Sequence, residues 1–216
     1  GSRLVGSEMC IRDRKIRDHQ VYDSNKYQII HFLKKFNIRV HDLGVLKDDK
    51  IKVDKFYKKN QNKFDIIISS GGSSFSSKDY ISSFLSQNTE LLFKYVRIQP
   101  GRPVIFSKLK FNYYFSLPGN PLAVFTNLFF LVSLFIDPSR KDNSRITKSY
   151  QSGFSENKKS NITKFYRVKL SKNRLYTHNS KGSAKLISLS EADGLAFVPE
   201  GNDKIKKGEK ISFIEF

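Results

Sequence analysis

Strand-like and helix-like segments alternate along residues 24–136, and this alternation constrains the fold more than any other feature of the chain. From Ser24 to Asn37, apolar residues recur at the spacing of an amphipathic helix. Residues 64–68 form a compact apolar run that ends in Ser-Ser-Gly-Gly, which is typical of a buried strand breaking into a glycine loop. Strands that alternate with helices predict an α/β fold, with a mainly parallel sheet and helices on both faces.

The remaining segments of this region repeat the pattern. Further strands are predicted at 38–43, 91–98, 103–107 and 113–117, and further helices at 53–59, 79–87 and 122–136. The last helix is the most apolar run, but it is shorter than the roughly 20 residues that span a bilayer, and it contains polar side chains. A buried helix is therefore predicted there, and no membrane partner is expected.

The composition changes after residue 136, where a polar stretch without periodicity begins. Short β-prone runs follow at 165–170, 174–176, 185–189, 195–198 and 210–214. This spacing predicts a small all-β barrel domain. We therefore divide the chain into an α/β domain at 15–140, a linker at 141–159 and the barrel at 160–216. Residues 1–14 show no apolar period and are interpreted as a non-native scar or tag.

The composition also narrows the class of function. The single cysteine, Cys10, excludes a disulfide framework and a cysteine-based zinc site, and it makes a reducing cytoplasm the expected location. The four histidines show no metal-ligand spacing. The net charge of +19 suits a nucleic-acid partner, but the 39 Lys and Arg residues are spread over most segments. We therefore favour a solvated basic surface and do not expect nucleic acid as a partner.

Two loops follow predicted strands at positions where α/β proteins bind ligands. Ser69-Ser70-Gly71-Gly72 leaves backbone N–H groups open to a ligand, because glycine has no Cβ to obstruct its approach. Pro118-Gly119-Asn120-Pro121 precedes a helix whose first N–H groups attract a phosphate. Each loop also has a plain alternative, as a tight turn or a rigid corner. Ligands bind at the carboxyl ends of strands in such sheets, so the two loops together favour an anion or heterocycle site.

Three carboxylates are predicted on the same edge of the sheet. Asp48 and Asp49 lie in the loop after one strand, and Asp79 lies at the start of a helix. Paired carboxylates beside an oxyanion suit Mg²⁺, which takes carboxylate oxygens and keeps several waters. The alternative is that Asp79 caps its helix and that Asp48 and Asp49 are turn residues. The sequence leaves both interpretations open.

Taken in order, these motifs resemble the molybdopterin molybdenumtransferase family, which includes MoeA and the gephyrin E domain. The matching segments in the α/β region are Val21–Asn25, Asp42–Gly44 with Asp48-Asp49, Ser69–Gly72 with Ser74, Asp79-Tyr80, Pro100–Pro103 and Leu117–Pro121. Gly182–Ala184, Ala192–Leu195 and Pro199–Gly201 are similar to the last β domain of the family. The resemblance extends over residues 18–216.

The resemblance implies an enzyme of molybdenum cofactor biosynthesis. Its reaction would insert molybdate into adenylylated molybdopterin with Mg²⁺ present and AMP released, in a homodimer whose pathway neighbour is a MogA-type adenylyltransferase. The loops at 70–72 and 118–121 would hold the pterin and its phosphates. Asp48 and Asp79 would be catalytic, and Asp48 would serve the metal and phosphate region. By motif position, the residues at the molybdate end would be Ser74, Asp79, Arg102, Arg167 and Ser183.

Several positions depart from the family pattern. Tyr95 and Gln99 stand where basic residues are usual, and Ser76 replaces a loop glycine, so weaker anion and pterin binding is expected. The first strand of the family should precede Lys15, where the scar stands, and the printed sequence does not contain the two N-terminal domains. We therefore expect the α/β domain to lack its first strand and the chain alone to show little or no turnover.

Two other functions remain open. A MogA-type molybdopterin adenylyltransferase shares the α/β domain but lacks the β domain predicted at 160–216. A basic scaffold or nucleic-acid-binding module on the same fold is compatible with the charge of +19 and with the departure at Gln99. Adenylyl transfer from ATP would indicate the first alternative. Salt-dependent binding of nucleic acid without pterin affinity would indicate the second.

Overall fold

Two six-stranded sheets organise the chain, one in each of two units. A computed structural model describes residues 2–6, 10–11, 21–22, 24–73, 79–141, 147–177 and 187–216. The first unit comprises Gly1–Val96 and Pro103–Leu128, and the second comprises Arg97–Arg102 and Phe129–Phe216. Each unit buries its own apolar core. The predicted fold class, an α/β domain followed by a small β barrel, is confirmed.

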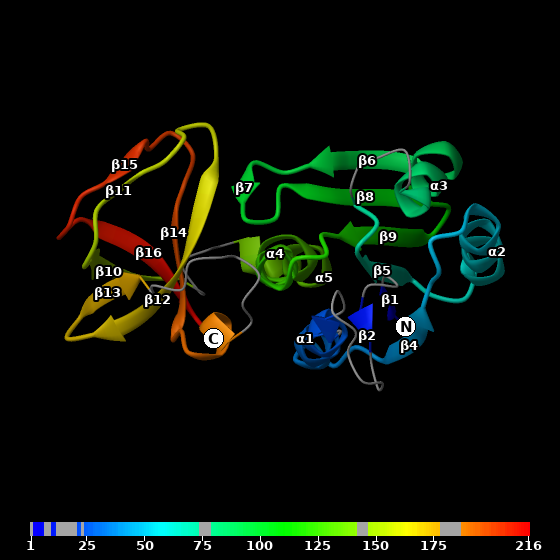
Figure 1. The fold of residues 1–216 in the computed structure, drawn as a ribbon, viewed down its shortest axis with the longest axis horizontal. Coiled ribbons are helices and arrows are strands. Elements are labelled where there is room, and N and C mark those ends of the chain that lie inside the picture. Colours follow the sequence, from blue (N-terminus) through cyan, green and yellow to red (C-terminus); the bar gives the residue numbers. More distant parts are fainter. Residues whose placement is uncertain are drawn as a thin grey trace. The chain divides into compact units, whose positions relative to one another are not determined.

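The sheet of the first unit has the strand order β4-β1-β5-β9-β8-β6 (Figure 1). Its strands are β1 (Ser2–Gly6), β4 (Val40–Val45), β5 (Ile66–Ser70), β6 (Glu90–Tyr95), β8 (Pro103–Leu109) and β9 (Asn112–Leu117). Parallel pairing joins β4, β1, β5 and β9, whereas β8 runs antiparallel to both of its neighbours. The sheet is therefore mainly parallel, and the carboxyl ends of β5 and β9 are adjacent.

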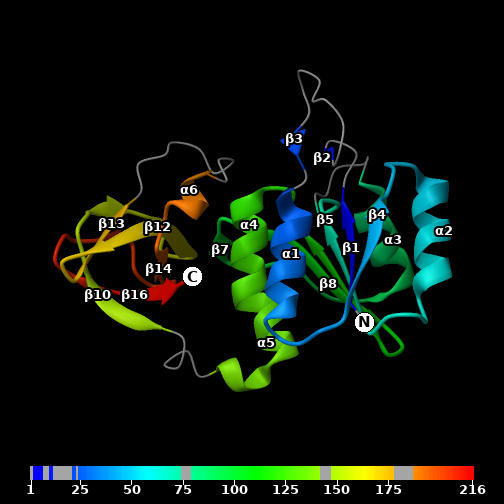
Figure 2. The same ribbon diagram turned by 90° about the horizontal axis from the view of Figure 1, so that it is seen from below.

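Helices cover both faces of this sheet (Figure 2). The first face carries α1 (Ser24–Lys34) and α4 (Pro121–Asn127), which contact each other, and the opposite face carries α2 (Lys50–Asn60) and α3 (Tyr80–Asn88). After α4 the chain continues as a π-helix η1 (Leu128–Val132), α5 (Ser133–Ile136) and a 3₁₀ turn η2 (Pro138–Lys141). Within the described ranges, no helix combines the length and apolar character that a membrane span requires.

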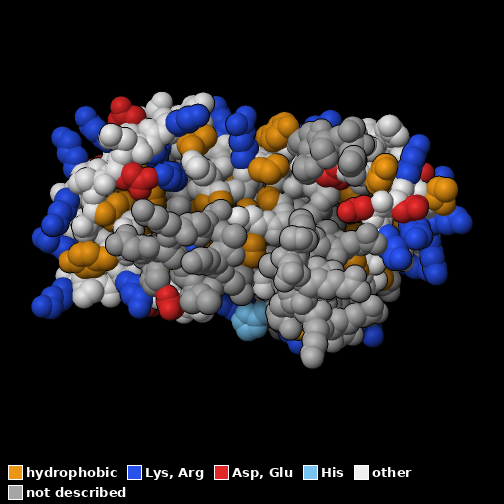
Figure 3. All heavy atoms as spheres, viewed as in Figure 1, with side chains coloured by type: hydrophobic (Ala, Val, Ile, Leu, Met, Phe, Trp, Pro, Cys, Tyr) orange, Lys and Arg blue, Asp and Glu red, His pale blue; other side chains and the backbone are white. Residues whose placement is uncertain are grey.

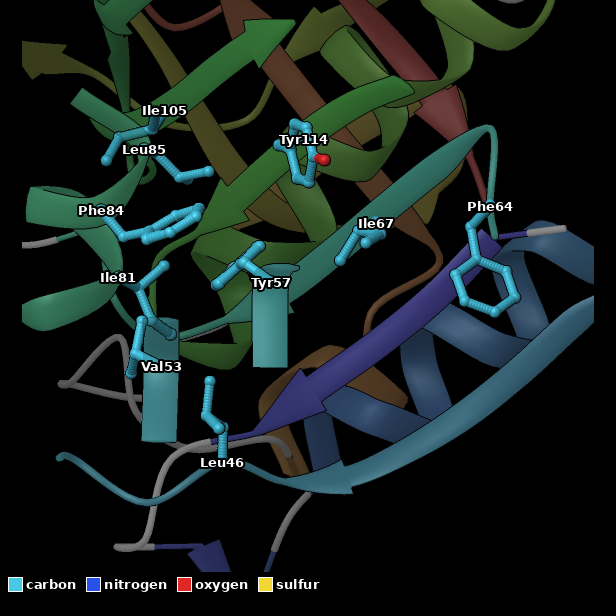
Figure 4. Packing of buried hydrophobic residues seen from close by; sticks show 10 residues of the cluster. All are labelled: Leu46, Val53, Tyr57, Phe64, Ile67, Ile81, Phe84, Leu85, Ile105 and Tyr114. Carbon is cyan, nitrogen blue, oxygen red and sulfur yellow. The ribbon is translucent and has the colours of Figure 1, made fainter. Parts of the chain in front are cut away.

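Apolar side chains between the sheet and helices α2 and α3 form a core of the first unit (Figure 4). Tyr57 of α2 stacks on Phe84 of α3 with ring centroids 4.8 Å apart, and it also packs against Tyr114 of β9 at 5.7 Å. Val53, one turn before Tyr57, is equally buried. This apolar stripe explains why the lysine-rich segment forms a helix: one face is buried while the other carries the charges.

Part of the segment interpreted as a scar forms strands, at residues 2–6 and 10–11, and its interpretation as non-native stays a prediction. Ser2–Gly6 forms β1, which pairs in parallel with β4 on one side and with β5 on the other. Ser2–Gly6 therefore occupies a strand position of this sheet between β4 and β5, which the sequence analysis did not expect. A further short parallel pair joins β2 (Cys10–Ile11) to β3 (Val21–Tyr22). A strand of five residues carries too little periodicity to be recognised alone, and here its two neighbours supply the pairing.

The sheet of the second unit has the order β13-β10-β16-β14-β12-β7, and an additional pairing of β13 with β12 closes five of these strands into a barrel. The strands are β7 (Ile98–Gln99), β10 (Lys148–Ser152), β12 (Thr163–Ser171), β13 (Arg174–Thr177), β14 (Gly194–Val198) and β16 (Lys210–Glu215). A two-stranded ribbon joins β11 (Glu156–Asn157) to β15 (Lys204–Ile205). The buried core comprises Tyr166, Val168, Leu175, Ala196, Val198, Ile205, Ile211 and Phe213.

Three sequence predictions need correction in this unit. The predicted linker at 141–159 contains β10 and β11, which pair with β16 and β15, so the barrel begins before residue 160. Ile187–Ser190 forms a helical turn, α6, where a strand at 185–189 was predicted. The predicted strand at 91–98 is divided, because β6 belongs to the first unit and β7 to the second.

Candidate functional site

The glycine loop after β5 and the proline-glycine corner after β9 lie side by side at the carboxyl edge of the first sheet. The parallel register pairs Ser70 with Leu117, the last residues of these two strands. The Gly71 N–H donates to the Leu117 carbonyl at 2.9 Å, and Ser116 Oγ donates to the Gly71 carbonyl at 3.1 Å. The prediction that both loops belong to one edge of the sheet is confirmed by this register.

A buried amide side chain connects the two loops. Asn25, the second residue of α1, donates from Nδ2 to Ser70 Oγ at 2.7 Å and to the Gly119 carbonyl at 2.8 Å. The sequence analysis did not assign a role in the site to Asn25, because its partners lie 45 and 94 positions away along the chain. One signal was available: Asn25 precedes the buried Ile29 by one helical turn and therefore lies on the apolar face of α1.

The glycines of the two loops are present for different reasons. Gly72 has a φ of +78°, and a Cβ added there would lie 2.7 Å from Ile81 Cδ1, so both the backbone conformation and α3 exclude a side chain. Gly119 is under neither constraint. Its φ lies outside the left-handed region, and an added Cβ would meet no described atom within 4 Å. The space in front of Gly119 is therefore open within the described part of this unit.

The first turn of α4 satisfies its own amide groups. Asn120 Oδ1 accepts from the N–H of Leu122 at 3.0 Å and of Ala123 at 3.3 Å, and the Asn120 carbonyl accepts from Val124 at 2.9 Å. Pro121 has no N–H. The geometry therefore does not support the expectation that these helix amides bind a phosphate. The corner instead leaves open the space on the Cβ side of Gly119.

The structure does not gather the three candidate metal carboxylates into one site. Asp49 caps α2 by accepting from the Lys52 N–H at 2.9 Å, and Asp79 caps α3 by accepting from the Ser82 N–H at 2.9 Å. Asp48 lies on the exposed turn before α2. Among the residues with described positions, no three His, Cys, Asp or Glu side chains form a metal-binding group. The alternative interpretation of Asp79 as a helix cap is confirmed, and Asp49 has the same role.

Comparison with known proteins identifies the family. A family model described as a probable molybdopterin binding domain matches residues 4–137, and one described as the MoeA C-terminal region, domain IV, matches residues 151–216. The chain belongs to the MoeA family. The family resemblance found in the sequence is therefore confirmed, and most of β1 lies inside the first match.

The similar proteins come from molybdenum cofactor biosynthesis. The chain is 30% identical over 136 residues to a molybdopterin molybdenumtransferase of Haemophilus influenzae, covering 63% of this chain and 34% of that protein. It is 25% identical over 229 residues to the molybdopterin molybdenumtransferase of a Nostoc species, covering 98% and 51%. The MoeA protein of Pyrococcus horikoshii shares the fold, with a TM-score of 0.82, 24% identity and coverage of 99% and 53%. The chain therefore spans about half or less of the length of these relatives.

Two residues that the MoeA resemblance places at the molybdate end belong to the second unit. Arg167 lies on β12 and is partly buried, and this burial lowers the pKa of its guanidinium. Arg102 is exposed and follows β7 in the segment assigned to the same unit. Ser74 and Ser183, like the departure at Ser76, lie outside the described residues. The structure thus puts the two arginines in the barrel unit and the two loops in the α/β unit.

Basic side chains of this MoeA family member occur over both units on the face shown in Figure 3. On α2, the exposed lysines are Lys50, Lys52, Lys55, Lys58 and Lys59. Lys52, Lys55, Lys58 and Lys59 point away from the face that buries Val53 and Tyr57, and Lys50 is the first residue of the helix. Such a distribution is typical of a solvated helix face.

Two of the positions that depart from the family pattern are described in the structure. Tyr95 is 52% exposed at the end of β6, and Gln99 is exposed on β7.

Proposed function

We propose that this chain supplies the pterin-binding and barrel parts of a molybdopterin molybdenumtransferase. The reaction inserts molybdate into adenylylated molybdopterin and releases AMP. Family membership supports this proposal, as does the meeting of two glycine-containing loops at the carboxyl edge of a mainly parallel sheet. The activity remains a proposal for this chain because it spans about half or less of its relatives.

The observation that carries the proposal is the open space at Gly119. Replacing glycine by alanine stabilises a protein where the backbone conformation allows it, because the unfolded chain then has fewer states to lose. At Gly119 both the backbone conformation and the surrounding space would allow alanine, so the protein's own stability does not explain why this residue is glycine. We explain this by a ligand that approaches the backbone closely. In this proposal, a flat pterin ring, or the phosphate attached to it, occupies the open side of Gly119.

We assign the remaining roles by chemistry. The hydroxyl of Ser70 and the backbone of the two loops would hydrogen-bond the pterin and its phosphates. The guanidinium groups of Arg102 and Arg167, with Ser74 and Ser183, would hold molybdate, because the arginine fork matches the geometry of an oxyanion. Dimerisation of the complete enzyme is a further part of this proposal and follows from the family resemblance alone.

Mg²⁺ is compatible with the described residues only as an ion shared with the substrate. The three candidate carboxylates do not form a protein site, and Asp49 and Asp79 each use one oxygen to cap a helix. Mg²⁺ commonly takes one or two carboxylates and completes its shell with substrate phosphates and water. Asp48 or Asp79 would supply the protein ligand. We derive no step of the reaction through the ion.

Binding of molybdopterin to this chain under anaerobic conditions tests the proposal. We expect the wild type to bind and Gly119→Ala to bind at least about tenfold more weakly, a loss of roughly 1.4 kcal/mol. The melting temperature should not fall, because the added Cβ enters space that the described protein leaves open. If Gly119→Ala binds molybdopterin as tightly as the wild type does, the ligand does not occupy the open space beside Gly119. No binding by the wild type would remove the basis of the proposal.

Turnover distinguishes the MogA-type alternative. The barrel unit argues against that alternative, because residues 151–216 match the C-terminal region of MoeA. Formation of adenylylated molybdopterin from ATP would favour a MogA-type enzyme, whereas molybdate-dependent release of AMP would favour our proposal. The greater length of its relatives supports the expectation of little turnover from this chain alone.

A further inference from the structure

The side-chain amide of Asn25 hydrogen-bonds both loops of the proposed pterin site, at 2.7 Å to Ser70 Oγ and at 2.8 Å to the Gly119 carbonyl. Asn25 is 2% exposed and Ser70 is 6% exposed. Water therefore competes little for these contacts, and the two bonds fix the amide firmly. A third element of the fold, α1, thus determines how the two loops present their groups.

The Gly119 carbonyl fixes the direction of both bonds. A carbonyl oxygen only accepts, so the part of the Asn25 amide that faces Gly119 is the NH₂ group. One N–H is used on Gly119 and the other on Ser70, which makes Ser70 Oγ the acceptor in its contact. The hydroxyl proton of Ser70 therefore points away from Asn25. Within the described part of the chain, no acceptor receives that proton.

Stability alone does not explain an asparagine at this position. Asn25 Oδ1 is buried and has no hydrogen-bond partner among the described residues. An unsatisfied buried oxygen is unfavourable. A residue that only filled the space would be apolar, as Ile29 is one turn later on the same face. The two bonds that the amide donates are therefore the reason for its presence.

We propose that Asn25 is a positioning residue that aims the Ser70 hydroxyl at an acceptor atom of the bound pterin. This inference rests on the proposed function, because it assigns the missing acceptor to the ligand between the loops. A buried donor with a fixed direction favours ligands that carry an oxygen or ring nitrogen at that point and discriminates against those that do not. Ser70 thereby contributes to specificity, and Asn25 acts through it.

A double-mutant cycle on molybdopterin binding tests this inference. We expect Ser70→Ala to bind about tenfold more weakly and Asn25→Leu to bind at least as weakly as Ser70→Ala. The double variant should bind no more weakly than Asn25→Leu, because an undirected hydroxyl no longer contributes. Gln28→Leu is the matched control, since its amide is also buried on α1, and it should bind as the wild type does. Losses that multiply in the double variant would overturn the inference.

Hydrogen exchange of the ligand-free chain tests the positioning role of Asn25 independently of whether the chain binds molybdopterin. The Gly71 N–H donates to the Leu117 carbonyl across the two loops, so its exchange reports whether they stay together. We expect exchange at Gly71 at least about tenfold faster in Asn25→Leu and unchanged in Gln28→Leu. If Asn25→Leu does not fold, Asn25→Asp keeps the shape and loses the NH₂ donors.

The outcomes of the exchange experiment are distinct. Unchanged exchange at Gly71 in the Asn25 variants would overturn the positioning role. Suppose that exchange is faster in these variants but the wild type does not bind molybdopterin. The proposed function would then be wrong, whereas the role of Asn25 in ordering the loops would be supported. Faster exchange together with the non-additive binding losses would support both.

Discussion

The two loops at the carboxyl edge of the first sheet look alike in sequence, since each places glycine between a strand and a helix, yet the fold needs only the glycines of the first loop, where Gly71 has a φ of +88°. Gly72 is required by its φ of +78° and by the closeness of Ile81. Gly119 is required by neither its conformation nor its described neighbours. A glycine that the protein itself does not need indicates a ligand more specifically than the presence of a glycine motif does.

The largest effect is expected from Gly72→Ala. Strain in the left-handed region and a clash with Ile81 together should lower the free energy of unfolding by about 3 kcal/mol. Chemical denaturation monitored by circular dichroism measures this loss. Gly119→Ala is the matched control and should stay within about 0.5 kcal/mol of the wild type. Equal losses in the two variants would abolish the distinction between the loops.

A smaller effect is expected at the entrance to α3, where Asp79 caps the helix from a position that is 8% exposed. Asp79→Ala should lower the free energy of unfolding by about 1 kcal/mol, whereas Asp79→Asn should cost less than about 0.5 kcal/mol because asparagine caps nearly as well. Thermal denaturation of both variants checks this. If Asp79→Asn keeps its stability but loses affinity for adenylylated molybdopterin, the negative charge serves the ligand as well as the helix.

The smallest effect is expected away from both loops, on the basic face of α2. Lys52→Glu and Lys55→Glu reverse exposed charges, and we expect the affinity for molybdopterin to change by less than about twofold at physiological ionic strength. A titration of the double variant measures this. A large loss of pterin binding would show that α2 belongs to the site. Salt-dependent nucleic-acid binding that disappears in the double variant would instead favour the scaffold alternative.

The sequence predicts the first unit well where each element carries its own pattern. The apolar stripe of α1 and the run that ends in the Ser-Gly-Gly loop were both interpretable without partners. β1 and β10 were missed for a physical reason. Ser2–Gly6 is too short to show a period, and Lys148–Ser152 is mostly polar, so each is a strand because of its neighbours in the sheet.

The parts of the candidate site that depend on local sequence patterns could also be predicted, and those that depend on distant contacts could not. Its two loops follow recognisable strands, and a parallel sheet brings the ends of such strands to one edge. The capping role of Asp79 was also local enough to be considered from the sequence. The contacts of Asn25 were not, because residue type and helical position do not reveal partners 45 and 94 positions away.

The assignment of Arg97–Arg102 to the second unit means that the chain passes between the units three times, after residues 96, 102 and 128. The second unit is therefore not one continuous segment of the chain. A gene fragment that starts at residue 129 would encode β12 without β7, its parallel neighbour at Thr163 and Lys164. Without β7, the edge of β12 at Thr163 and Lys164 would be unpaired, and unpaired strand edges promote self-association. A protein designed to contain the barrel alone should therefore include the six residues Arg97–Arg102.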